Sequence, residues 1–448
     1  MAKKRGQTRI AVGFVALGCP KNIVDSERML AEIAQADMVI TAELEQADVI
    51  VVNTCGFIEP AKREAFEAIK HAVNSKRKGN VKKVVVAGCL SERMGEQLFK
   101  EIQGVDAIVG LGQRDNIVKI IRQSLTSKKH ASYLEHACSD ISDDKTRLLI
   151  TGAHSAYLRI SEGCDHKCSF CTIPAIRGRF RSKPVETVLV EAKELAKAGV
   201  VELNIIAQDT AYYGKDLKMK EGLAKLLAEV EKIAGLEWIR VMYLYPVGFT
   251  DKLLEMVAGS DKIVHYFDIP IQHVSDPILK AMRRPDTKEG LYQLIEKLRK
   301  VLPDVVLRTT LIVGFPSETD EQFAELLEFI KWAKFDALGT FKYYAETGTD
   351  AAKMAEQVPE KVKEKRLDEL MLAQQEIAFA KNQSIKGAEF RCLVESVAEN
   401  GTGTGRYYGQ APEIDSVCII ENCTANAGEF AKVKVAGMKD YDLLVRQI

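Results

Sequence analysis

Long apolar runs are absent from this sequence of 448 residues. A membrane-spanning helix needs ~20 consecutive apolar residues, and no stretch approaches that length, so no membrane contact is expected. The segment MAKKRGQTRIAVGFVALGC is basic and then apolar, as a signal peptide is. Its apolar part is short and lacks a small-residue cleavage pattern, which favours a first buried strand instead. We therefore expect a cytoplasmic location.

Cysteine is sparse and net charge is missing. Ten cysteines in 448 residues are too few for a disulfide scaffold, and metal ligation in a reducing compartment fits them better. Lys+Arg and Asp+Glu both total 63, so no global field directs the molecule toward nucleic acid, and any charged binding surface must be local. The length indicates about two to four domains.

The amino-terminal part repeats one design three times. The segments RIAVGFVALGC, ADVIVVNTC and VKKVVVAGC are rich in Val and Ile and end at Cys19, Cys55 and Cys89. Helix-like stretches lie between them, which predicts a parallel α/β sheet over residues 8–123. Ligands of such sheets gather beyond the carboxyl ends of the strands, so the sheet should bring the three cysteines together. Taken alone, they could also be unrelated buried thiols.

Three further regions follow. Residues 124–146 are polar and lack apolar periodicity, which predicts a linker. Over 147–380 strand-like and helix-like runs alternate, as in a partial parallel (β/α) barrel whose chemistry belongs at the carboxyl ends of its strands. Residues 383–448 contain short strands separated by Gly-rich turns such as NGTGTG, which predicts a small antiparallel β-barrel.

Cys164, Cys168 and Cys171 stand in the spacing C-x3-C-x2-C within SEGCDHKCSFC, directly after a predicted strand. Thiolates are the usual ligands of iron–sulfur clusters, and three thiolates on a 4Fe-4S cluster leave one iron open to another ligand. A zinc site is the alternative, but structural zinc usually has four ligands, commonly in C-x2-C pairs.

This loop resembles that of the radical S-adenosylmethionine superfamily, in which the open iron binds the methionine moiety of S-adenosylmethionine. The resemblance implies that a reduced cluster cleaves this cofactor to a 5′-deoxyadenosyl radical. It assigns Phe170 to an aromatic position whose backbone approaches the adenine. Four more strand-end positions resemble cofactor contacts more loosely and could also be turn or core residues: Gln208, Gln272, Gly314 and Glu318. No catalytic residue is expected beyond the cluster ligands.

The whole chain resembles the methylthiotransferase family. The resemblance rests on LGCPKN, NTC and AGC at the amino-terminal cysteines, on the barrel, and on a terminal barrel of the kind called TRAM. It implies that Cys19, Cys55 and Cys89 bind a second 4Fe-4S cluster that takes part in sulfur delivery. The methyl group would come from a second molecule of S-adenosylmethionine. An electron donor such as a flavodoxin or ferredoxin is implied as a partner.

The choice of substrate depends on finer motifs. LGCPKNIVDSE, YLYP, QHVSDPILKAMRR and APEID resemble the branch that methylthiolates the β-carbon of an aspartate in a small-subunit ribosomal protein of the decoding centre. Asp415–Ser416 departs mildly from the PEIDG of that branch. Residues 383–448 carry seven basic and nine acidic side chains, a net charge of −2, whereas an RNA-binding module should be basic. The alternative substrate is an adenosine of transfer RNA.

A rival from another class is a non-catalytic RNA- or ribosome-binding protein with zinc-stabilised folds. The remaining cysteines, Cys138, Cys392, Cys418 and Cys423, could be extra ligands or redox switches. Cys418 and Cys423 lack a strong partner pattern, and we interpret these two as ordinary buried or partly exposed thiols.

Overall fold

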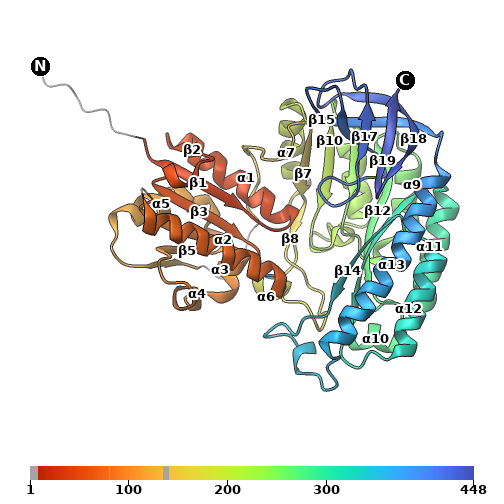
Figure 1. Cartoon of the computed structure of the whole chain (residues 1–448), viewed down its shortest axis with the longest axis horizontal. Helices are drawn as coiled ribbons and strands as arrows, with labels where there is room; N and C mark the ends of the chain where they lie inside the picture. Colours follow the sequence, from red (N-terminus) through yellow and green to blue (C-terminus); the bar gives the residue numbers. More distant parts are fainter. Residues whose placement is uncertain (1–8, 80, 135–140) are drawn as a thin grey trace, which may run out of the picture. The chain divides into compact units, whose positions relative to one another are not determined.

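The computed structural model describes residues 9–79, 81–134 and 141–448. Cys138 lies outside the described residues. The chain folds into two compact units (Figure 1). The first contains the chain up to Ile150 together with Glu162–Asp165 and Thr172–Arg181, and the second contains Thr151–Ser161, His166–Cys171 and Ser182–Ile448. The C-x3-C-x2-C loop is therefore shared, with Cys164 in the first unit and Cys168 and Cys171 in the second.

A six-stranded parallel sheet forms the first unit, in the order β2-β1-β3-β4-β5-β6. Its strands are β1 (Ala11–Ala16), β2 (Val39–Thr41), β3 (Val49–Thr54), β4 (Lys83–Gly88), β5 (Ala107–Val109) and β6 (Ala131–Tyr133). The last strand, β6, lies within residues 124–146, which the sequence predicts to be a linker. Its residue Ala131 pairs with Ala107 of β5, so this part of the range belongs to the sheet.

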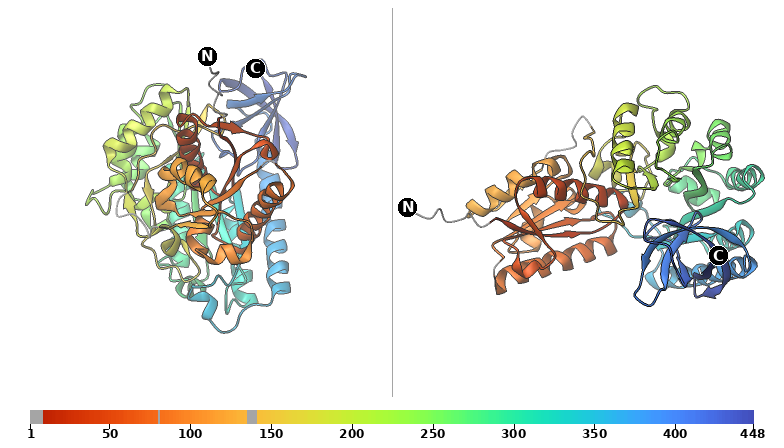
Figure 2. Two further views of the ribbon diagram at one scale, coloured as in Figure 1. Left: turned by 90° about the vertical axis from the view of Figure 1, so that its left-hand side faces the viewer. Right: turned by 90° about the horizontal axis from the view of Figure 1, so that it is seen from above.

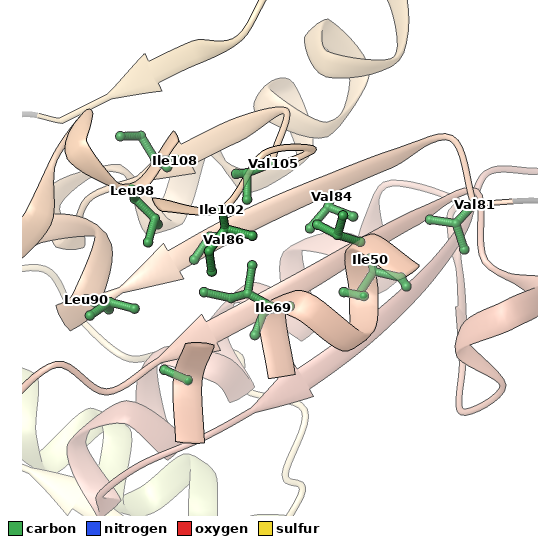
Figure 3. Close-up of a cluster of buried hydrophobic side chains, with 14 of the residues drawn as sticks. Ile50, Ile69, Val81, Val84, Val86, Leu90, Leu98, Ile102, Val105 and Ile108 are labelled. Atoms are coloured by element: carbon green, nitrogen blue, oxygen red, sulfur yellow. The ribbon is translucent and has the colours of Figure 1, made fainter. Parts of the chain in front are cut away.

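Helices cover both faces of this sheet. They are α1 (Pro20–Gln35), α2 (Glu59–Lys78), α3 (Cys89–Met94), α4 (Gln97–Glu101) and α5 (Ile117–Thr126), with 3-10 turns η1 (Leu44–Gln46) and η2 (Leu111–Asn116). Because side chains alternate along a strand, Ile50 of β3 packs toward Ile69 of α2 (Figure 3), while its neighbour Val51 packs toward Ile33 of α1. Both faces of β3 are thus buried, which explains the apolar run Val49–Val52 in this strand.

The second unit contains another parallel six-stranded sheet, in the order β14-β13-β12-β11-β10-β7. Its strands are β7 (Ser155–Arg159), β10 (Glu202–Ile206), β11 (Trp238–Val241), β12 (Ile263–Gln272), β13 (Val306–Val313) and β14 (Ala337–Lys342). The sheet is open, with β7 and β14 at its edges. Two short strands, β8 (Ser161–Glu162) and β9 (Arg181–Ser182), form a separate pair.

Helices alternate with these strands, so the partial (β/α) barrel expected from the sequence is confirmed. They are α7 (Val185–Lys197), α8 (Gly222–Val230), α9 (Asp251–Ala258), α10 (Asp276–Ala281), α11 (Lys288–Val301), α12 (Asp320–Ala333) and α13 (Glu360–Ser384), with 3-10 turns η3 (Thr210–Tyr212), η4 (Pro246–Gly248) and η5 (Ala351–Lys353). A short helix of the first unit, α6 (Ile173–Arg177), follows the cysteine loop. No helix among the described residues is long and apolar enough to cross a membrane.

A closed five-stranded barrel ends the chain, shown in blue in Figure 2. Its strands are β15 (Glu389–Val397), β16 (Gly403–Tyr407), β17 (Cys418–Glu421), β18 (Phe430–Lys439) and β19 (Asp442–Gln447). The barrel was expected to be antiparallel, and all its pairs are so except β17 with β19, which are parallel. Cys392, Cys418 and Cys423 lie in its apolar core.

Buried charges join this barrel to the parallel sheet within the second unit. Glu202 of β10 is fully buried and accepts hydrogen bonds from Arg240 of β11 at 3.0 Å and from Arg406 of β16 at 2.5 and 3.1 Å. Burial raises the pKa of Glu202, but the two guanidinium groups outweigh it and lower that pKa to about 2. The carboxylate therefore stays ionised across the physiological range.

The loop between β16 and β17, which contains APEID, also contacts the sheet. The Asp415 carboxylate accepts hydrogen bonds from the Tyr266 hydroxyl of β12 at 2.7 Å and from Arg308 Nε of β13 at 3.3 Å. On β7, the Tyr157 hydroxyl donates to Glu413 at 3.3 Å. Three strands of the sheet thus hold this one loop.

Candidate functional site

Strand ends position the three amino-terminal cysteines. Cys55 follows β3 directly, Cys89 follows β4 directly and begins α3, and Cys19 lies three residues after β1 and precedes α1. Because β1, β3 and β4 are parallel neighbours, their carboxyl ends share one edge of the sheet. Burial raises the pKa of the Cys89 thiol, and the charges of Cys55 and Cys19 add to that rise.

Two glycines make this gathering sterically possible. Gly18 has φ +97, and a Cβ there would lie 2.8 Å from the Cys55 Cβ. Gly88 has φ +92, and a Cβ there would overlap Asn53 Oδ1. Both backbone conformations are disfavoured for residues with a side chain. The cysteine-bearing turns therefore depend on glycine at both positions.

Burial makes the Cys55 and Cys89 thiols harder to ionise unless a bound group stabilises the thiolate. Burial raises the pKa of Cys55, and the neighbouring Cys19 raises it further. Burial raises the pKa of Cys89 to about 12, against the lowering effect of the Arg177 charge. A bound cation is the kind of group that would deprotonate such thiols.

Arg177 was not singled out from the sequence. It ends α6, is buried, and its Nη2 lies 3.3 Å from Cys89 Sγ. The same guanidinium donates to Asp25 at 3.1 Å and to Glu162 at 2.9 Å. The only local signal is an arginine in the otherwise apolar run IPAIR, and nothing in that run indicates a partner at position 89.

In the second unit, the loop that carries Cys168 and Cys171 is held by its backbone and by Ser169. The Cys171 N–H donates to the Cys168 carbonyl at 3.2 Å. Ser169 N–H donates to the Met282 carbonyl at 3.0 Å, and its hydroxyl donates to the Ala281 carbonyl at 2.8 Å. In the first unit, Cys164 N–H donates to the Gly178 carbonyl at 3.1 Å. Within each unit, hydrogen bonds thus hold the backbone of its part of the cysteine loop in place.

Polar and aromatic groups surround Cys168. Burial raises the pKa of its thiol, whereas the Arg284 charge and the Tyr245 hydroxyl lower it. The Tyr245 ring stacks on His166, with centroids 4.2 Å apart, and carries the Arg284 guanidinium 4.1 Å from its centroid. His166 Nε2 lies 2.7 Å from Asp209 Oδ2. His166, Asp209 and Tyr245 also line a cavity of about 470 Å³.

The other predicted contacts fall at the same edge of the second sheet. Gln208 lies two residues after β10, Gln272 ends β12 with φ +69, and Gly314 follows β13 with φ +71. The Glu318 carboxylate accepts hydrogen bonds from the N–H groups of Gly314 and Phe315. Burial raises the pKa of Glu318 to about 7, although Arg366 lowers it. Glu318 therefore acts on the turn that presents Gly314.

Phe170 packs against an apolar cluster. Its ring meets Phe315 edge to face at 6.5 Å, beside Met282 and Tyr343. This packing fixes the backbone between Cys168 and Cys171. A role in cofactor binding stays a prediction for Phe170 and for the four strand-end positions.

Both cysteine sets suit an iron–sulfur cluster in their donor chemistry, because thiolates are its usual protein ligands. Among the described residues, no group of three or more His, Cys, Asp or Glu side chains is spaced for one metal ion. A cluster of four irons holds its thiolates farther apart than a single ion does.

A C-x3-C-x2-C loop on a parallel sheet of this kind defines the radical S-adenosylmethionine class of enzymes. The family model described as the radical SAM superfamily matches residues 158–330. Models described as uncharacterized protein family UPF0004 and as the TRAM domain match residues 11–110 and 387–448.

Within this class, the chain belongs to the family of ribosomal protein uS12 methylthiotransferases. Its relative RimO from Acetivibrio thermocellus is 44% identical over 441 residues, which cover 97% of each chain. RimO from Symbiobacterium thermophilum is 43% identical over 97% of this chain and 90% of its own. RimO from Clostridioides difficile is 42% identical over 97% of this chain and 98% of its own. The family expected from the sequence is confirmed.

Solved structures share the fold at low identity. The radical S-adenosylmethionine methyltransferase TsrM from Kitasatospora setae has a TM-score of 0.55 at 12% identity and covers 75% of each chain. The cobalamin-dependent radical enzyme OxsB has a TM-score of 0.51 at 14% identity, over 82% of this chain and 56% of its own. These likenesses support the architecture alone.

Proposed function

We propose that this enzyme methylthiolates the β-carbon of an aspartate in the small-subunit ribosomal protein uS12, using S-adenosylmethionine and two 4Fe-4S clusters. The observation that carries the proposal is the second cysteine set. Cys19, Cys55 and Cys89 end neighbouring parallel strands and meet at one edge of their sheet. Generation of the radical needs only the cluster of Cys164, Cys168 and Cys171, so a second set of gathered thiols supports a further chemical step at a second cluster.

Cys164, Cys168 and Cys171 would hold the cluster that, when bound and reduced, supplies the 5′-deoxyadenosyl radical. Cys19, Cys55 and Cys89 would hold the second cluster. The protein contributes position, orientation and exclusion of water. Ser169 donates hydrogen bonds to the carbonyls of Ala281 in α10 and of Met282, and these bonds fix the loop that carries Cys168 and Cys171.

The remaining predicted residues would form the S-adenosylmethionine site. Gly314 lets the backbone approach the cofactor closely, and Glu318 keeps that turn closed through its two backbone hydrogen bonds. Gln208 and Gln272 would offer neutral amide groups, which can bond ribose, amino or carboxylate groups without burying a charge. Phe170 would set the loop backbone beside the adenine.

The substrate assignment has two supports. The relatives named above are uS12 methylthiotransferases, and the terminal barrel of this chain has a net charge of −2 over 383–448, which suits a basic protein better than RNA. We propose that the enzyme acts in the cytoplasm and receives electrons from a flavodoxin or ferredoxin. We also propose domain bounds of 8–123, 147–380 and 383–448, and the connection at 124–146 contributes β6 to the first sheet.

Metal analysis after anaerobic purification tests the cluster count. The wild type should hold about eight irons and eight sulfides per chain. The triple variant C19A/C55A/C89A and the triple variant C164A/C168A/C171A should each hold about four. The first should still cleave S-adenosylmethionine without inserting sulfur, and the second should do neither. Stoichiometric zinc without sulfide would overturn the proposal.

Mass spectrometry tests the substrate. In a strain that lacks the gene, the uS12 aspartate should lose its methylthio mass, and transfer-RNA nucleosides should be unchanged. Complementation with the wild-type gene should restore the modification, and complementation with C19A/C55A/C89A should not. An unchanged uS12 together with a lost methylthio-adenosine would assign the enzyme to transfer RNA instead.

A further inference from the structure

One buried arginine connects the two sequence motifs that carry cysteine. Arg177 lies six residues after Cys171, at the end of α6, yet its guanidinium donates toward the sulfur of Cys89 at the end of β4. Both residues belong to the first unit, where α6 contacts α3 (Figure 1). The contact is therefore a fixed part of this unit.

The guanidinium is held in one orientation. Its Nη1 donates to Glu162 at 2.9 Å and its Nη2 donates to Asp25 at 3.1 Å as well as to Cys89 Sγ at 3.3 Å. Its side chain is 2% exposed. Asp25 also accepts from Arg114 at 2.7 Å, so its negative charge is shared between two arginines. Because arginine does not lose its proton in proteins, a positive charge faces the sulfur at every pH of interest.

We propose that Arg177 is a positioning residue that sets the reduction potential of the cluster held by Cys19, Cys55 and Cys89. Hydrogen bonds to ligand sulfurs and nearby positive charge stabilise the more negative, reduced form of a cluster and so raise its potential. Glu162 and Asp25 aim the donor. The inference rests on the proposed function, since it requires a cluster at these cysteines.

The test uses the full-length chain carrying C164A/C168A/C171A, so that one cluster reports. Potentials are measured by reductive titration monitored by electron paramagnetic resonance, with iron and sulfide counted in each sample. R177Q should shift the potential to a more negative value with about four irons retained. R177K, which keeps the charge but loses the fork, should shift it less. The control is R28Q, which removes a guanidinium from α1 that binds Asp115 and the Lys145 carbonyl, and it should leave the potential unchanged.

An unchanged potential in R177Q with iron retained would overturn the role of Arg177. If R177Q loses its iron, the potential of R177K is used instead. R177K lacks the guanidinium fork that donates to Cys89, so an unchanged potential in R177K would also overturn the proposal. The parent variant separates this result from the proposed function: if it holds no iron with arginine at position 177, the amino-terminal cysteines bind no cluster, and the proposed function fails first. In a wild-type background, cleavage of S-adenosylmethionine should be the same in R177Q and R28Q.

Discussion

Gly88 shows how much one residue contributes to the cysteine edge of the first sheet. Its φ is +92, and a Cβ at this position would overlap Asn53 Oδ1, which leaves no room for alanine. We expect G88A to lower the free energy of unfolding by about 2 kcal/mol and to reduce iron bound by Cys19, Cys55 and Cys89. Denaturant unfolding of the iron-free protein and iron counting measure the two effects.

The matched control for this substitution is G437A in β18. A Cβ at Gly437 meets no atom within 4 Å, and its backbone is not left-handed. Alanine there should leave both stability and iron content as they are. Equal losses in the two variants would show that the turn at position 88 is not special.

A second residue-scale prediction concerns His273, which follows Gln272 and is fully buried. Its Nδ1 accepts a hydrogen bond from the Ser275 N–H at 3.0 Å. Burial, with a smaller effect of Arg366, lowers the pKa of His273 from 6.5 to about 3. Below pH 6.5 the histidine therefore binds a proton in the unfolded chain but stays neutral in the folded chain. As the pH falls from 6.5 toward 3, protonation of the unfolded chain lowers the free energy of unfolding.

Replacing this histidine should remove that pH dependence. Between about pH 6.5 and about pH 5.5 the wild type should lose about 1 kcal/mol through His273. H273N, whose side-chain oxygen can still accept from Ser275, should lose less over the same interval. Denaturant unfolding at the two pH values compares the slopes, and parallel slopes would show that His273 is not kept neutral.

At this scale, residues with a local spacing or a shared strand-end position could be predicted, and residues whose contacts depend on tertiary packing alone could not. The spacing of Cys164, Cys168 and Cys171 is contained in eight consecutive residues, so the sequence alone indicates it. The contact of Arg177 with Cys89 joins residues 88 positions apart, and no periodicity reports such a pair. The same holds for Tyr245, which follows β11. The pairing of strands in the second sheet brings it near Cys168, and no local pattern indicates that contact.

Between elements, the buried carboxylate of Glu202 makes β10, β11 and β16 depend on one another. E202Q would leave the buried guanidinium group of Arg240 without its counter-charge and would leave Arg406 with the Glu395 carboxylate alone, at a cost of about 3–5 kcal/mol. We expect hydrogen exchange to accelerate in β15–β19 before it does so in the first unit. Denaturant unfolding and exchange mass spectrometry measure these effects.

An exposed ion pair between the same parts of the chain provides the control. Arg391 of β15 bonds Glu237 at 3.0 Å, with the two side chains 54% and 47% exposed. Exposed pairs contribute little, so E237Q should cost less than ~1 kcal/mol. If E237Q and E202Q were equally harmful, burial would not be the reason for the effect.

Most strands and helices can be predicted from short-range sequence patterns, whereas the pairing of strands is harder to predict. The alternation of strand-like and helix-like runs over 147–380 predicts the second sheet, and strands β10 and β13 coincide with runs rich in β-branched residues, VELNII and VLRTTLIV. Short helices such as α9 are hard to predict, because eight residues carry little periodicity and the Thr250 side chain that accepts from Leu253 N–H is the main sign of where the helix begins. The parallel pairing of β17 with β19 has no sequence signal, since strand direction is decided by the connection that closes the barrel.

For the molecule as a whole, the balance of charge predicts weak binding of transfer RNA. With 63 basic and 63 acidic residues in total and a slightly acidic terminal barrel, neither the whole chain nor this barrel has the excess of basic residues that is typical of an RNA-binding protein. Added transfer RNA should therefore not slow methylthiolation of purified uS12 at low salt, where nonspecific phosphate contacts are strongest. Product formation is followed by mass spectrometry, and concentration-dependent inhibition would contradict this expectation.

The loop that contains APEID has a consequence for how such enzymes can be recombined. Asp415 is bound by Tyr266 and Arg308, and Glu413 is bound by Tyr157, so the partners of one loop lie on three strands of another fold. A terminal barrel grafted from a relative with a different loop would leave Arg308 and Tyr266 facing the wrong groups. A working chimera must therefore take the residues at positions 157, 266 and 308 from the same parent as the barrel, so the barrel and the sheet have to be exchanged together.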